Sequence, residues 1–132
     1  MHEKRIPIRW RDQDAYGHVN NAVYLTYLEE VRDEWLARAL GDGPALWDYV
    51  VARVAIDFRR ELTQDDGIVV ARCRLDRIGT SSVRTRETLE TEDGTLAAES
   101  EAVLVARDRE SGESRPLSDD ERDKLEAEAD LA

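Results

Sequence analysis

The chain has 132 residues, of which 41% are hydrophobic and 37% charged, and its formal net charge is −11. This length predicts one domain with a single core, and the acidic excess argues against nucleic acid as a partner. Cys73 is the single cysteine, so the chain forms no internal disulfide. The sequence predicts no signal peptide and no apolar run of about 20 residues that spans a bilayer. We therefore expect a cytoplasmic protein, and five arginines over residues 72–86 favour an anionic small molecule as its ligand.

The first elements follow from the spacing of apolar residues. Ile6, Ile8 and Trp10 alternate with Pro7 and Arg9 and predict a short strand that Trp10 ends. The segment DQDAYGHVNN predicts a loop because it is rich in Asp, Asn and Gly. A helix is expected over residues 21–40, where one apolar stripe recurs at helical spacing; it contains Tyr24, Leu28, Val31 and Trp35, widened by Leu25, Leu36 and Leu40.

The ends of this helix carry sequence signals of their own. Asn20 or Asn21 is expected to cap its first turn through a side-chain oxygen. The sequence Gly41-Asp42-Gly43-Pro44 is expected to end it, because glycine favours a helix C-terminus and proline cannot continue a helix.

Four strand-like segments follow, over residues 49–58, 68–78, 82–91 and 95–107. Turns at residues 78–81 and 92–94 contain glycine and predict hairpins, so these strands should be antiparallel. Ser118 and Glu121 form a capping-box signature that opens a short acidic helix or tail over residues 118–132. The predicted fold class is α+β, with one domain over residues 1–132. A curved antiparallel sheet of about five strands wraps one long central helix.

Several residue types coincide at fixed spacing in the segment RWRDQDAYGHVNNAVYLTYLEEVR, residues 9–32. The Asp12-Gln13-Asp14 triplet, the GHVNN sequence of residues 17–21, and the later Tyr24, Tyr27, Glu29 and Arg32 resemble the 4-hydroxybenzoyl-CoA thioesterase-like family of the hotdog superfamily. Weaker similarity covers AIDFRRELTQDD, LDRIGTSSV and the last strand, so that the resemblance extends over residues 5–118.

This resemblance implies a hotdog-fold enzyme that hydrolyses the thioester of an acyl-CoA, or of an acyl-carrier protein. It implies a homodimer or homotetramer in which two sheets join edge to edge, with active sites at the subunit interface. It implies no metal and no other cofactor. The catalytic carboxylate falls on Asp14, and the backbone N–H that polarises the thioester carbonyl falls near Asn21.

The residue types suit this chemistry. Asp14 can activate water as a general base or attack the carbonyl itself, and the sequence leaves both routes open. The start of a helix supplies free N–H donors and partial positive charge for an oxyanion. Gly17 permits close approach of the backbone to a substrate. His18 and Asn20 orient water or hold the loop.

Each of these residues also has a structural interpretation. Asp14 is a common turn residue, Asn20 and Asn21 are good helix caps, and His18 can pack and form hydrogen bonds within the loop. Glu29 and Arg32 lie three residues apart and are expected to pair. A metal site built from Asp12, Asp14 and His18 is not expected, because no further histidines cluster there. Cys73 is expected to be buried and inert.

The phosphates of coenzyme A require cationic contacts. The arginine candidates are Arg59, Arg60, Arg77 and Arg84, with solvated strand arginines as the alternative interpretation. Ser81 and Ser82 follow the turn at Gly79 and join these candidates, because the resemblance places this hairpin near the partner's active site.

Two other functions remain open at this point. One is a hotdog dehydratase or hydratase, which needs a histidine paired with Asp or Glu, and His18 is the only histidine away from the N-terminus. The other is a non-catalytic dimer that binds an acyl ligand, since a fold does not settle a function.

Overall fold

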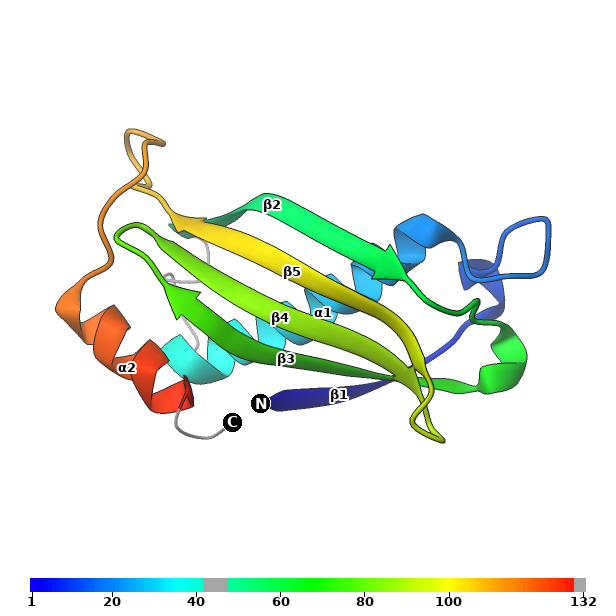
Figure 1. The fold of residues 1–132 in the computed structure, drawn as a ribbon. Coiled ribbons are helices and arrows are strands. Elements are labelled where there is room, and N and C mark those ends of the chain that lie inside the picture. The colour runs from blue at the N-terminus through cyan, green and yellow to red at the C-terminus, as the bar shows by residue number, and fades with distance from the viewer. Residues whose placement is uncertain (42–47, 130–132) are drawn as a thin grey trace.

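The structure, a computed structural model, describes residues 1–41 and 48–129. The element order is the predicted one: strand, long helix, four strands and a final helix (Figure 1). The elements are β1 (His2–Pro7), α1 (Asn21–Leu40), β2 (Tyr49–Phe58), β3 (Ile68–Ile78), β4 (Ser82–Thr91), β5 (Leu96–Ala106) and α2 (Asp119–Ala129). Among the described residues, 3₁₀ turns at Trp10–Asp12 and Gln64–Asp66 lie in the connections.

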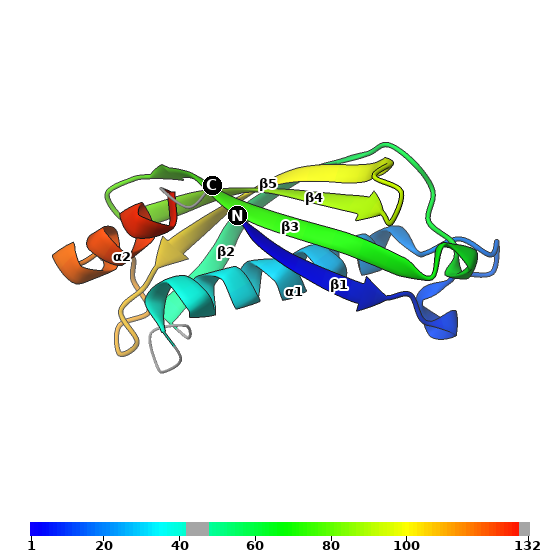
Figure 2. The same ribbon diagram turned by 90° about the horizontal axis from the view of Figure 1, so that it is seen from below.

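The five strands form one antiparallel sheet in the order β1-β3-β4-β5-β2. The sheet curves around α1, which runs along one of its faces (Figures 1 and 2). The β3–β4 and β4–β5 connections are the predicted hairpins. The predicted architecture is therefore confirmed.

The core lies between α1 and the sheet. The predicted apolar stripe of α1 is buried, and Tyr27 joins it, against sheet residues such as Val69, Val83 and Leu89. Leu25 is the exception, because it lies off this stripe and is 41% exposed. Gly41 caps the C-terminus of α1 with a positive φ, as predicted. The other three residues of that signal lie outside the described residues.

The first strand differs from its prediction at Trp10. Ile6 and Ile8 are buried, but β1 ends at Pro7 and the Trp10 side chain is 76% exposed. The cause is a turn over residues 9–12, in which the Asp12 N–H donates to the Arg9 carbonyl at 2.9 Å. The Arg9 N–H in turn donates to Asp12 Oδ2 at 2.9 Å. Trp10 thus begins a 3₁₀ turn instead of ending a strand.

The alternation of β2 also breaks. The strand has the predicted bounds, but a bulge at Ala52 shifts its register against β5 between Val51 and Arg53. Val50 therefore lies on the opposite face from Val54, Ile56 and Phe58, with which the simple alternation would group it. β2 forms one edge of the sheet, and Val51 and Phe58 are exposed on it.

A buried ion pair joins α1 to the middle of the sheet. Arg32 Nε donates to Glu87 Oε2 at 2.6 Å, and Arg32 Nη2 donates to Glu87 Oε1 at 2.9 Å. The hydroxyls of Thr85 and Ser100 also donate to the Glu87 carboxylate, at 2.8 and 2.7 Å. The predicted Glu29–Arg32 pair is wrong, because Arg32 points into the core while Glu29 is exposed.

We expect Arg32→Met to lower the free energy of unfolding by about 3–5 kcal/mol, because it leaves the Glu87 carboxylate buried without a counterion. Urea titration measures the change. Arg53→Met is the matched control: its partner Glu101 lies on the exposed side of the sheet, and the expected loss is below about 1 kcal/mol. Adding Glu87→Gln to Arg32→Met should restore part of the loss, since it removes the unpaired charge. Equal losses for Arg32→Met and Arg53→Met would contradict this account.

The C-terminal helix α2 closes the end of the sheet near the β3–β4 hairpin (Figure 1). The predicted capping box is present, since the Ser118 N–H donates to Glu121 Oε1 at 2.9 Å and the Glu121 N–H donates to Ser118 Oγ at 3.1 Å. Leu125 is fully buried, and Arg122 Nη2 donates to the Gly79 carbonyl at 2.7 Å. Within the described residues, no helix is long and apolar enough to cross a membrane.

Glu121 makes the stability that α2 adds to the fold dependent on pH. Hydrogen bonds from Arg115, and then from the Ser118 backbone, lower the pKa of Glu121 from 4.5 to about 2. A lowered pKa in the folded state stabilises the fold at pH values above the ordinary pKa. This contribution is therefore complete above pH 4.5 and is lost as the pH falls from 4.5 towards 2.

We expect Glu121→Gln to lower the free energy of unfolding at pH 7, with a difference from the parent protein that shrinks as the pH falls from about 4.5 to about 3. Urea titrations across this range measure it. Asp123→Asn is the control, because Asp123 is an exposed carboxylate of the same helix. A difference that stays constant between neutral and acidic pH would rule out the linkage.

Candidate active site

The chain between the first 3₁₀ turn and α1 forms a small hairpin. Gln13 and Val19 pair as an antiparallel bridge, and the Asp14 N–H donates to the His18 carbonyl at 2.8 Å. Gly17 closes the turn at a φ of +81°, which favours glycine. Opposite residues of an antiparallel pair point to the same side. Asp14 and His18 therefore share one side of the hairpin, and Gln13 shares the other with the buried Val19.

Asp14 lines an open hollow of about 520 Å³. Its Oδ1 accepts the Tyr16 N–H at 2.9 Å, whereas Oδ2 has no hydrogen bond within the part of the chain that the structure describes. The other lining residues are Trp10, Arg11, Gln13, Ala15 and Gly17. The side chains of Trp10 and Tyr16 are 76% and 85% exposed. One carboxylate oxygen is thus oriented by the loop while the other remains available.

The start of α1 lies directly after this hairpin. Asn20 is the predicted cap, since its Oδ1 accepts the Ala22 N–H and its carbonyl accepts the Val23 N–H, both at 2.8 Å. The Asn20 N–H itself donates to the Asp12 carbonyl at 2.9 Å. The Asn21 N–H has no hydrogen bond to any residue in the ranges 1–41 and 48–129. It lies at the positive end of the α1 dipole and is available to an external acceptor.

Asp12 holds the base of the hairpin. It is buried, and its Oδ2 accepts the Tyr27 hydroxyl at 2.6 Å and the Arg9 N–H at 2.9 Å. Burial, followed by this bond, raises the pKa of Tyr27. Tyr24 and Tyr27 are buried in the core, and their hydroxyls also form hydrogen bonds that hold the hairpin and the segment after β2.

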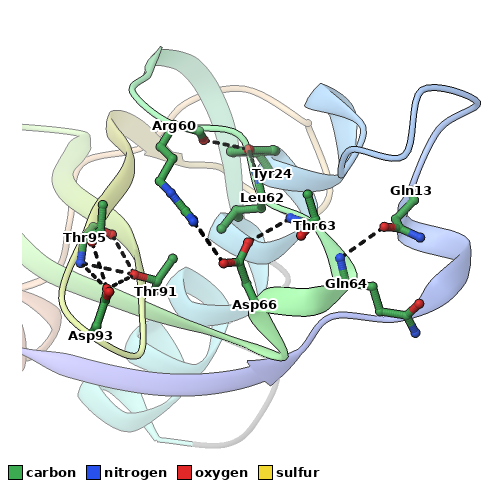
Figure 3. A network of polar contacts seen from close by, with 10 residues as sticks. All are labelled: Gln13, Tyr24, Arg60, Leu62, Thr63, Gln64, Asp66, Thr91, Asp93 and Thr95. Carbon is green, nitrogen blue, oxygen red and sulfur yellow. Dashed lines mark hydrogen bonds and ion pairs between the residues drawn. The ribbon is translucent and has the colours of Figure 1, made fainter.

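The segment that follows β2 packs against the same hairpin (Figure 3). The Tyr24 hydroxyl donates to the Arg60 carbonyl at 2.9 Å and accepts the Leu62 N–H at 2.8 Å. Gln13 Oε1 accepts the Gln64 N–H at 3.1 Å. The Leu62 carbonyl accepts the Val19 N–H at 2.7 Å. These hydrogen bonds fix residues 60–64 against α1 and the hairpin.

His18 meets a residue from this second segment. Its Nε2 lies 3.1 Å from Glu61 Oε2, and the two side chains are 40% and 72% exposed. Sequence reasoning missed Glu61 because its contact with His18 depends on tertiary structure, and no local pattern marks it. The segment after β2 thus contacts the hairpin through His18 as well as through Gln13 and Val19.

The predicted phosphate-binding residues divide into two groups. Arg59 and Arg60 lie just after β2, where Arg59 pairs with Glu99 at 2.8 Å and Arg60 pairs with Asp66 at 3.2 Å. The other predicted residues lie at the β3–β4 hairpin, at the opposite end of the sheet (Figure 1). Three of them line a hollow of about 120 Å³: Arg77, Ser82 and Arg84. Ser81 directly precedes Ser82, and its carbonyl accepts the Ala106 N–H at 2.9 Å. Within one protomer, this second group is not brought to Asp14.

Three further observations concern the chain outside this hairpin. A hollow of about 380 Å³ lies on the sheet face away from α1 and is lined by several charged residues, including Arg53, Arg74 and Arg86. Among the described residues, no group of three or more His, Cys, Asp or Glu side chains is arranged to hold a metal ion. Cys73 is buried as predicted, and burial raises the pKa of its thiol, which keeps it inert at neutral pH.

The curved antiparallel sheet wrapped around one long helix is the hotdog fold. The chain belongs to the thioesterase-like superfamily, whose family model matches residues 8–125. This match confirms the family resemblance and the expectation of a thioester hydrolase.

Individual relatives agree with this assignment. The chain is 26% identical to the long-chain acyl-CoA thioesterase FadM of Escherichia coli, over 94% of this chain and 96% of that protein. Its fold matches a thioesterase from Thermus thermophilus, solved with coenzyme A and zinc, with a TM-score of 0.89, 32% identity and coverage of 98% and 94% of the two chains. A predicted thioesterase from Bacillus stearothermophilus matches with a TM-score of 0.87, 25% identity and coverage of 96% and 95%.

We expect Tyr27→Phe to lower the free energy of unfolding by about 1–3 kcal/mol, because it leaves a buried Asp12 oxygen without its hydroxyl donor. Amide exchange of Asn20 should also accelerate, since its N–H bonds to Asp12. Urea titration and hydrogen exchange measure the two effects. Tyr16→Phe is the matched control, because the Tyr16 side chain is exposed. If both variants behave alike, Asp12 is not the anchor of the hairpin.

Proposed function

We propose that the protein hydrolyses acyl-CoA thioesters with Asp14 as the catalytic carboxylate. The observation that carries this proposal is the position of Asp14 on the hairpin that leads directly into α1, where the Asn21 N–H is available to an acceptor. A thioester carbonyl placed between them meets a carboxylate at its carbon and an N–H donor at its oxygen. The acyl-CoA activity of the FadM relative supports this substrate class.

In the general-base route, Asp14 accepts a proton from water while the water oxygen attacks the thioester carbon. The tetrahedral oxyanion accepts a hydrogen bond from the Asn21 N–H, a contact worth about 3 kcal/mol in such sites. The C–S bond then breaks, the CoA thiolate leaves and takes the proton, and the free acid forms. In the nucleophilic route, the Asp14 carboxylate attacks the carbon, releases the CoA thiolate, and water hydrolyses the resulting anhydride.

The proposal assigns the remaining groups as follows. Gly17 keeps the hairpin tight, Asn20 caps α1 so that the Asn21 N–H points outward, and His18 orients polar groups beside Asp14. Arg59 and Arg60 lie at the end of the sheet that bears Asp14, where they can bind phosphate after exchanging their carboxylate partners.

The β3–β4 hairpin contributes to coenzyme A binding only from a second copy of the chain. We propose a homodimer that pairs the free edges of two β2 strands, since β2 is a ten-residue edge strand with exposed apolar side chains. Such a dimer offers Arg77, Ser81, Ser82 and Arg84 of one protomer to the Asp14 hollow of the other. The coenzyme A held by the Thermus relative supports a CoA thioester as the substrate.

A second candidate function is dehydration or hydration of an acyl thioester. The observation that favours it is the His18–Glu61 pair, because that reaction requires a histidine beside a carboxylate. The reaction products distinguish the two candidate functions. Hydrolysis releases a thiol, whereas hydration of an enoyl-CoA removes the conjugated double bond and releases no thiol.

We expect the purified protein to release thiol from at least one member of a panel of short, long and aromatic acyl-CoAs. Asp14→Asn should lower kcat by about 100-fold or more, because it removes the proton acceptor or nucleophile. Asp65→Asn is the matched control, since Asp65 is an exposed carboxylate of the neighbouring segment. Molar mass and thermal midpoint should stay unchanged in both variants. No turnover of any substrate, or an Asp14→Asn rate equal to that of the parent protein, would show that the proposal is wrong.

A further inference from the structure

We infer that Glu61 is a positioning residue that holds the His18 imidazole beside Asp14. This inference rests on the proposed function, because it assigns a role within the Asp14 site. Its central contact is the 3.1 Å approach of His18 Nε2 to Glu61 Oε2. A carboxylate at ion-pair distance favours the ring orientation that brings Nε2 towards it, and so restrains the rotation of the imidazole.

The hairpin register explains why the imidazole matters to Asp14. The Asp14 N–H bonds to the His18 carbonyl, which makes these residues opposite neighbours. Their side chains therefore leave the hairpin on the same side, with Cβ atoms about 5 Å apart. The His18 side chain is 40% exposed, so the packing around it leaves room for rotation. The Glu61 carboxylate supplies the restraint that packing does not.

The backbone on either side of Glu61 is held unusually firmly for a connecting segment. A single hydroxyl, that of Tyr24, donates to the Arg60 carbonyl and accepts the Leu62 N–H (Figure 3). The Leu62 carbonyl also accepts the Val19 N–H, which joins residues 60–62 to the residue after His18. Tyr24 and Val19 are buried, so residues 60–62 are attached to the core. The Cα of Glu61 is thereby fixed relative to His18, whatever its own side chain does.

The other charges of the segment leave Glu61 free for His18. Both Nη atoms of Arg60 donate to Asp66 Oδ1 at 3.2 Å. Arg59 donates to Glu99. Neither arginine therefore takes the Glu61 carboxylate. Asp65 lies in the same segment, and no ion pair joins it to a residue in the described ranges.

Loss of this restraint should affect the chemical step more than binding. A ring in one orientation keeps its second nitrogen at a constant place relative to Asp14, where it can hold water or a reacting oxygen. A freely rotating ring spends less time there. Since Glu61 itself touches no proposed phosphate-binding arginine, KM should change little while kcat falls.

The test compares Glu61→Ala, Glu61→Gln, His18→Ala and the Glu61→Ala/His18→Ala double variant, with Asp65→Ala as the matched control. All are assayed for thiol release from the best acyl-CoA of the panel. We expect Glu61→Ala to lower kcat about fivefold, the upper range for an exposed ion pair, with KM and thermal midpoint unchanged. Glu61→Gln keeps an acceptor oxygen and should fall between Glu61→Ala and the parent protein. The double variant should be no slower than His18→Ala.

Three results would overturn the inference: a Glu61→Ala rate equal to that of Asp65→Ala, a loss confined to KM, or losses that multiply in the double variant. Any of these together with an inactive Asp14→Asn variant removes the role of Glu61 and leaves the proposed function standing. An Asp14→Asn variant that retains full activity removes the proposed function itself, so the two failures are distinguishable.

Discussion

The site depends first on the buried carboxylate of Asp12. Asp12 receives hydrogen bonds from the Tyr27 hydroxyl on α1 and from the Arg9 N–H before the hairpin, while its carbonyl receives the Asn20 N–H after the hairpin. One residue therefore fastens both ends of the loop to the helix that follows it. Together with the bonds that join Val19 to Leu62 and Gln13 to Gln64, this fastening sets the position of Asp14 and the direction of the first α1 N–H groups.

Two contacts between the layers then place the loop relative to the sheet. The Arg32–Glu87 pair fixes α1 against β4, and the Tyr24 hydroxyl fixes the segment after β2 against α1. Both place polar groups in or near the core, where each must be fully bonded to be tolerated. The result is a rigid frame around a hairpin whose Asp14 and His18 side chains stay partly exposed.

Sequence patterns predicted the regular elements well and the tertiary contacts poorly. The limits of α1 followed from a long apolar stripe, the Asn20 cap and Gly41, and the strands from alternation between clear turns. The prediction that Trp10 ends a strand is wrong, because a turn closed by Asp12 outweighed an alternation of only three residues. The expected Glu29–Arg32 ion pair is wrong, because local spacing cannot reveal that the partner of Arg32 lies on β4. Glu61 gave no signal for the same reason, and the residues of the β3–β4 hairpin that were predicted to bind phosphate lie at the opposite end of the sheet from Asp14.

The central claim is that Asp14 meets the carbon, and the Asn21 N–H the oxygen, of one thioester carbonyl. The most direct measurement is a crystal structure of the Asp14→Asn variant with an intact acyl-CoA bound. The account predicts the carbonyl oxygen about 2.7–3.1 Å from the Asn21 nitrogen, with the side chain at position 14 facing the carbonyl carbon. A thioester bound instead on the outer face of the sheet, in the hollow that contains Arg53, Arg74 and Arg86, would contradict it.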